Sequence, residues 1–249
     1  MNGSHIIKRL SLIAAFSVIS HAQGAITVTQ STNGAGSDTF SAAFDVINAS
    51  SVLVVGFYVD DADGSRNPAN PRFGNGGGIG SGDVAPDSSY NSDRMNFYVF
   101  LNPDTAGGLQ FSIDNSSSVG GYTYAMWELA GVELDTGTFT VSTNTSITTD
   151  SANEFIVSIA GANGSAANVQ HNAGSDILLG SVIGGNNAPG GGGMRGGTIQ
   201  TTSPGTFDVS WTTSQFEGQI AIAFQAVPEP SCALLSLLGI GLACRRKRA

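Results

Sequence analysis

Lysine and arginine are scarce in the middle of this sequence. Charged residues make up 12% of its 249 positions, about half the share found in an average soluble domain. Between Arg9 and Arg245 the only basic residues are Arg66, Arg72, Arg94 and Arg195. All 19 acidic residues lie between Asp38 and Glu229, so four basic and 19 acidic residues give this part a net charge of −15. A surface of that charge repels nucleic acid and anionic lipid, and neither is expected as its partner.

Cysteine and histidine are scarce as well. The two cysteines, Cys232 and Cys244, lie near the C-terminal end. On a helix they would be about 18 Å apart, beyond the ~7 Å limit of a disulfide. Outside the first 24 residues, His171 is the only histidine. One imidazole without a nearby thiol argues against a zinc site. A Ser-His-Asp triad would have to use this one imidazole, and no serine lies in a G-x-S-x-G motif, which argues against a triad.

Glycine is abundant, with 34 residues, nearly twice its average share of about 7%. Short apolar or alternating runs predict strands near 25–30, 39–47, 52–59, 95–101, 109–113, 122–129, 139–142, 154–159, 206–212 and 219–226. The runs at 52–59 and 95–101 are apolar on both faces, as in strands covered from two sides. The pattern predicts an all-β fold, a single antiparallel, jelly-roll-like β-sandwich over residues 25–226.

Two glycine-rich stretches, 74–82 and 184–197, interrupt these runs and predict flexible surface loops. Gly191, Gly193 and Gly196 match the bare spacing of a dinucleotide-binding loop. Such a loop also needs a following helix, against which Pro204 and Gly205 argue. We interpret the match as accidental.

The first 24 residues have the layout of a secretory signal peptide. Lys8 and Arg9 precede an apolar run from Leu10 to Ile19, and small residues follow it. Cleavage after Ala22 or Gly24 fits the small-residue rule. The alternative is an uncleaved anchor, for which a run of about ten residues falls short of the ~20 of a membrane span. We therefore predict an N-terminal signal helix and export by the secretion machinery.

The last 23 residues have three parts. The motif Val227-Pro228-Glu229-Pro230-Ser231 ends the preceding strand, because its two prolines remove hydrogen-bond donors. Residues 232–244 form an uncharged apolar run. As a helix this run would cover about 20 Å of a hydrocarbon core of about 30 Å. The basic end, Arg245, Arg246, Lys247 and Arg248, would stay cytoplasmic under the positive-inside rule.

This tail resembles the PEP-CTERM sorting signal of Gram-negative bacteria over Val227 to Arg248. The resemblance implies recognition by a membrane-embedded exosortase, cleavage near the Pro-Glu-Pro motif, and release or attachment at the cell surface. It also implies an association with exopolysaccharide and biofilm matrix. Glu229 would then be a residue that the processing enzyme recognises. An ordinary C-terminal membrane anchor is the alternative. Residues 122–132 resemble, more weakly, secreted β-sandwich domains found ahead of such tails.

Paired carboxylates are the remaining route to catalysis, because glycosidases need two of them about 5 Å or about 6.5–9.5 Å apart. The candidates are Glu128, Glu133, Glu154 and Glu217. Glu128 follows Trp127 in a predicted strand, which would place a carboxylate beside an aromatic sugar platform. Solvated strand positions are the simpler interpretation, and we predict a non-enzymatic protein.

Aspartates make calcium the one cofactor that the sequence suggests. Asp60, Asp61 and Asp63 follow a strong strand, and Asp83 and Asp87 lie in the same long connection. Calcium takes six to eight oxygen ligands of this kind. The EF-hand pattern does not fit this segment, so ordinary turn aspartates are the alternative.

Carbohydrate contact is a further hypothesis. Trp127, Trp211 and Tyr124 could stack on sugar rings if they lay on a surface, whereas aromatic residues on strands more often belong to a core. The sequence as a whole predicts a secreted, non-enzymatic protein of the cell envelope or extracellular matrix, anchored transiently in the inner membrane by its C-terminal helix. The alternatives are a carbohydrate-binding module and a glycan-active hydrolase.

Overall fold

The computed structural model describes residues 26–36, 40–60, 69–74, 84–92, 94–103, 105, 107–114, 121–133, 144–177, 182–187, 192–213 and 215–226. All of them belong to one compact unit, Ala25–Ala226. They form an all-β structure in which every strand pairing is antiparallel, with a single 3-10 turn, η1 (Ala166–Asn168). The predicted signal peptide, the predicted tail and the predicted strand at 139–142 lie outside the described residues.

One five-stranded sheet, here called the N-terminal central sheet, has the strand order β1-β8-β3-β6-β5. Its strands are β1 (Thr27–Gly36), β3 (Val52–Asp60), β5 (Ser88–Ser92), β6 (Met95–Leu101) and β8 (Gly121–Ala130). The middle strand, β3, is buried at every position from Val52 to Val59. This confirms the prediction that 52–59 is a strand covered from both sides, and β6 beside it is buried in the same way.

A second five-stranded sheet, the C-terminal central sheet, has the order β13-β14-β11-β17-β9. Its strands are β9 (Val132–Glu133), β11 (Phe155–Ala162), β13 (Ile183–Asn187), β14 (Gly193–Gln200) and β17 (Phe216–Ala226). Most of the glycine-rich stretch 184–197 therefore belongs to β13 and β14, and the prediction of a surface loop there is wrong. Because β14 is a strand, the helix that a dinucleotide-binding loop requires does not follow Gly193.

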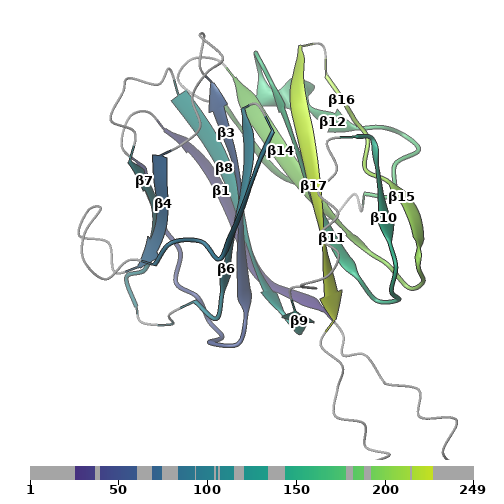
Figure 1. Cartoon of the computed structure of the whole chain (residues 1–249). Helices are drawn as coiled ribbons and strands as arrows, with labels where there is room; N and C mark the ends of the chain where they lie inside the picture. The colour runs from purple at the N-terminus through teal and green to yellow at the C-terminus, as the bar shows by residue number, and fades with distance from the viewer. Residues whose placement is uncertain are drawn as a thin grey trace, which may run out of the picture. The chain divides into compact units, whose positions relative to one another are not determined.

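Smaller sheets cover the outer faces of the two central sheets. The N-terminal outer sheet, of order β2-β7-β4, contains β2 (Phe40–Ala43), β4 (Ala69–Gly74) and β7 (Gln110–Asp114). On the other side lie two ribbons, β10 (Ser146–Thr149) with β15 (Gly205–Asp208) and β12 (Gln170–His171) with β16 (Trp211–Thr212). Figure 1 shows these layers side by side, with the central sheets between the outer ones. The described strands thus form four layers, where the sequence led us to expect two.

Three hydrophobic clusters separate these layers. The central cluster, which includes Val54 and Trp127, lies between the two central sheets. The N-terminal cluster includes Val55 and Phe111, and the C-terminal cluster includes Trp211. Neighbours along one strand supply different clusters, as Val54 and Val55 do, because successive side chains of a strand point to opposite faces. The inner strands of both central sheets are therefore buried on both faces.

Glycines allow the two central sheets to approach each other closely. A Cβ atom on Gly196 of β14 would lie 2.5 Å from Cη2 of Trp127, on the opposite sheet. A Cβ atom on Gly161 of β11 would lie 2.5 Å from Cδ2 of Tyr58. Each glycine therefore provides the space that an aromatic ring of the facing sheet fills.

We expect Gly196→Ala to lower the free energy of unfolding by about 1–3 kcal/mol, because its methyl group would overlap the buried Trp127 ring. Urea denaturation measures the change. Gly107→Ala is the matched control, since a Cβ at Gly107 meets nothing within 4 Å and its stability should match that of the unmodified protein or exceed it slightly. Equal stability of the two variants would contradict the close approach at Gly196.

Candidate functional site

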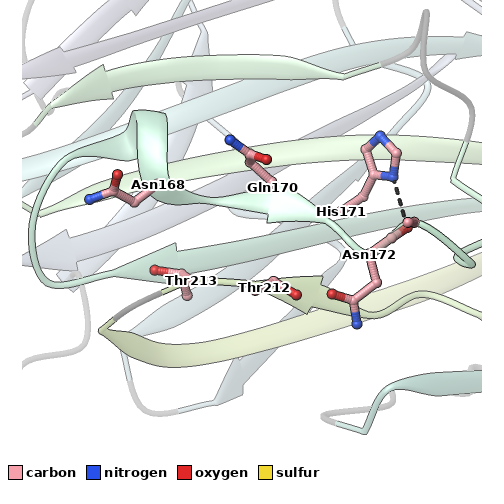
Figure 2. A pocket seen from close by; sticks show the side chains of 7 residues that line it. Asn168, Gln170, His171, Asn172, Thr212 and Thr213 are labelled. Atoms are coloured by element: carbon pink, nitrogen blue, oxygen red, sulfur yellow. Dashed lines mark hydrogen bonds between the residues drawn. The ribbon is translucent and has the colours of Figure 1, made fainter.

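A polar groove lies in the C-terminal outer layer beside β12 and β16, and we call it the β12 groove. It consists of two pockets, of about 470 and 560 Å³, that share Gln170, His171 and Ala173. The first pocket is completed by Asn168, Asn172, Thr212 and Thr213, and the second by Val182 and Arg195. Figure 2 shows the first pocket, with side chains from η1, β12 and the end of β16 around it.

Alternation along a short segment places polar groups in this groove. Val169 is fully buried in the C-terminal cluster, whereas its neighbours Asn168 and Gln170 are exposed. β12 then pairs with β16, so that Gln170 lies opposite Thr212. The sequence indicates no strand here, because a strand of two residues has no periodicity to detect. The sequence signal that could have indicated this segment is one apolar residue, Val169, between the amide residues Asn168 and Gln170.

His171 has a defined orientation in the groove. Its Nδ1 atom lies 3.1 Å from the carbonyl oxygen of Asn172. Because a carbonyl oxygen only accepts hydrogen bonds, this contact assigns the proton of the neutral ring to Nδ1 and leaves Nε2 as an acceptor. Figure 2 shows Nε2 on the side of the ring away from this bond. The ring also meets the Trp211 ring edge-on, with centroids 6.5 Å apart.

Arg195 supplies the positive charge of the groove. Its neighbours on β14, Met194 and Gly196, face the central cluster, so Arg195 points the other way, toward the C-terminal outer layer. The side chain is half-buried and forms no hydrogen bond or ion pair with any other described residue. None of the described residues that line the two pockets is acidic, although the surrounding chain is strongly acidic.

The aromatic residues predicted to stack on sugar lie elsewhere. Trp127 is 1% exposed in the central cluster, and Trp211 is 5% exposed and donates its Nε1 hydrogen to Oγ of Ser158 at 2.9 Å. A stacking platform needs an open ring face, so the prediction is wrong for both tryptophans, and the core alternative holds. Tyr124 is half-buried and lies over Gly34 of the neighbouring strand β1.

Glu128 is fully buried, and backbone and side-chain donors surround its carboxylate. Oε1 accepts a hydrogen bond from Asn48 N at 2.8 Å, Ile47 N lies 3.1 Å from each oxygen, and Oε2 accepts one from Nε2 of Gln30 at 2.7 Å. Burial acts to raise the pKa of Glu128, but the hydrogen bonds from Asn48, Gln30, Ile47 and Ser51 outweigh it and hold the pKa below its ordinary value. The carboxylate therefore fastens the turn at 45–48 to β8.

The other candidate glutamates do not join Glu128. Glu154 precedes β11 on the other central sheet, and its Oε1 accepts a hydrogen bond from Ser151 N at 2.7 Å. Trp127 and Phe155 both face the central cluster, so the adjacent glutamates point away from it in opposite directions. The structure therefore does not bring these two carboxylates together. The side chains of Glu133 and Glu217 lie outside the described part.

Of the five predicted calcium ligands, the structure describes Asp60 and Asp87, and these two lie far apart. Asp87 accepts a hydrogen bond from Leu101 N at 2.7 Å, and Leu101 lies opposite Val52, the first residue of β3. Asp60 is the last residue of β3, eight positions after Val52. At ~3.3 Å per residue, the backbone of Asp60 lies about 26 Å from that of Val52. The grouping of Asp60 with Asp87 in one site is therefore wrong. Asp61, Asp63 and Asp83 lie outside the described residues.

Across the described residues, no three His, Cys, Asp or Glu side chains form a group that could hold a metal ion. No helix in this part has the length and hydrophobicity of a membrane span. The sorting motif 227–231 and the basic end 245–248 lie outside it, and both stay predictions. Comparison with known proteins adds no assignment, because no protein-family model matches the chain and no curated protein is significantly similar to it.

We expect Glu128→Gln to lower the free energy of unfolding by about 2–3 kcal/mol at neutral pH. The substitution replaces one acceptor oxygen by an amino group that faces backbone N–H donors. Urea denaturation provides the measurement. Asp150→Asn makes the same change of charge at an exposed turn and should stay within about 0.5 kcal/mol of the unmodified protein. If both variants were equally stable, the carboxylate of Glu128 would not be holding the turn.

The lowered pKa of Glu128 also predicts that the fold loses stability in acid. A carboxyl with a lower pKa in the folded state adds stability above its unfolded value of about 4.3, and this contribution is lost as the pH falls through the folded pKa. We expect stability to fall more steeply between about pH 5 and pH 3 in the unmodified protein than in Glu128→Gln. Denaturation at a series of pH values tests this, and parallel curves would contradict it.

Proposed function

We propose that this chain is an exported, non-enzymatic protein of the cell envelope or extracellular matrix. In this proposal residues 1–24 direct secretion, and an exosortase-type enzyme processes the PEP-CTERM-like tail. The observation that carries the proposal is the order of motif, apolar run and basic end from Val227 to Arg248. Supporting it, β17 ends at Ala226, the residue before the motif, so cleavage at Pro228-Glu229-Pro230 would leave every described strand intact.

For the fold, we propose that the two central sheets are the jelly-roll-like β-sandwich that the sequence predicts, with the outer layers added to it. Support comes from the central cluster, which both sheets build together. The unit also contains no cysteine, so its stability rests on its three hydrophobic clusters without a disulfide. Such a protein can act as a durable scaffold in an extracellular setting.

A carbohydrate-binding module is the second candidate. The β12 groove favours it, because amide, hydroxyl, imidazole and guanidinium groups converge there and none of its described lining residues is acidic. The hydrolase alternative needs a pair of carboxylates at close range. Glu128 lies on β8 of one central sheet and Glu154 just before β11 of the other, and each already accepts a hydrogen bond from a backbone N–H of a turn.

We expect Glu229→Ala to prevent maturation. In a Gram-negative host that carries an exosortase, the unmodified chain should yield a product that ends near Pro228-Glu229-Pro230, as measured by intact-protein mass spectrometry. The variant should accumulate with its tail in the membrane fraction, as should the unmodified chain in a host without exosortase. Asp150→Asn controls for the loss of one carboxylate. Identical C-terminal ends with and without exosortase would overturn the sorting proposal.

A further inference from the structure

We propose that the β12 groove binds an oligosaccharide that carries carboxylates, such as a short chain of hexuronate residues. The proposal deepens the proposed function, since an extracellular matrix is where such a ligand would be met. The binding itself does not depend on how the tail is processed.

The neutral groups of the groove suit sugar hydroxyls, which both donate and accept hydrogen bonds. Asn168 and Gln170 offer an amide oxygen and an amino group each, and both are exposed. Thr212 adds a hydroxyl that is exposed opposite Gln170. His171 contributes Nε2 as an acceptor, because its Nδ1 hydrogen is bonded to the Asn172 carbonyl. Ala173 gives the shared lining an apolar part, against which sugar C–H groups can pack.

Arg195 selects for a negatively charged group on the sugar. Its planar guanidinium matches a carboxylate with two parallel hydrogen bonds. The side chain is half-buried beside Val182 and His171, and no described residue already pairs with it. No described lining residue is acidic, so a carboxylate paired with Arg195 meets no like charge among the described groups of the groove itself.

Salt screens most of the repulsion between this acidic unit and an acidic saccharide. Among its described residues the groove holds one guanidinium, whereas the chain between Arg9 and Arg245 carries a net charge of −15 from four basic and 19 acidic residues. At about 0.15 M salt, repulsion from charges beyond ~8 Å is largely screened, so contacts within the groove decide binding.

The test uses the full chain, purified in a mild detergent because of its apolar tail, at 0.15 M salt. The probes are a galacturonate hexamer and the same hexamer with its carboxylates reduced to alcohols. Titration calorimetry measures affinity, and Trp fluorescence provides a local readout because the Trp211 ring contacts His171. We expect the galacturonate hexamer to bind at least tenfold more tightly than the reduced hexamer and to change the emission of the protein.

Two arginine variants separate a specific contact from general electrostatics. Arg195→Gln should weaken galacturonate binding at least tenfold and leave the reduced hexamer nearly unaffected. Arg72→Gln makes the same change of charge on β4, in the N-terminal outer sheet, and should alter neither affinity. Gln170→Ala should weaken both hexamers. If Arg195→Gln does not fold by circular dichroism, Arg195→Lys replaces it and should lose part of the preference for galacturonate.

Each result decides a different claim. If neither hexamer binds, the groove is not a saccharide site, and the export proposal stands on its own processing test. Equal binding of the two hexamers overturns the assignment of Arg195 to a carboxylate, as would an equal effect of Arg195→Gln and Arg72→Gln. Loss of processing with retained binding would overturn the sorting proposal alone.

Discussion

Contact between bulky side chains and glycines across the two central sheets is the constraint on which the rest of this structure depends. Trp127 fills the space beside Gly196, and Ile159 fills the space beside Gly56 from the other direction. Once the sheets meet in this way, the directions of the neighbouring residues on the same strand follow from alternation. Arg195 is the clearest case, because the glycine next to it must face Trp127 and Arg195 must therefore face the outer layer. The packing of the core thus sets the position of Arg195, the one charged side chain among the described residues of the groove.

The acidic residues of the described part are satisfied mainly by backbone donors. Oδ1 of Asp45 accepts a hydrogen bond from Gly108 N at 2.7 Å, and Oδ2 of Asp176 accepts one from Asp208 N at 2.7 Å. Glu128 and Glu154 do the same at other turns. A chain with few basic residues can use its carboxylates in this way to fix turns between strands. Glu128, Glu154 and Asp87, which the sequence offered as catalytic residues or calcium ligands, hold turns in this way. None of these three residues lines the β12 groove.

Apolar strands were predictable from the sequence, and polar or glycine-rich strands were not. The runs at 52–59, 95–101 and 122–129 became β3, β6 and β8 with bounds close to those expected, because continuous burial leaves a strong local pattern. The sequence did not indicate β14 as a strand, because its glycines are typical of loops. Only the structure shows that Trp127 fills the space beside Gly196. β12 was missed because its two residues pair only with β16, about 40 positions away.

The sequence by itself determined the all-β class, the acidic character of the unit and the layout of the two ends from which export is proposed. Each of these depends on composition or on residues that are neighbours along the chain. The tertiary structure alone decided that there are four layers, that Trp127 and Glu128 are buried on opposite faces of β8, and that Arg195 and His171 share a groove. These relations join segments that are distant in sequence, and distant contacts leave no local pattern that a single sequence could reveal.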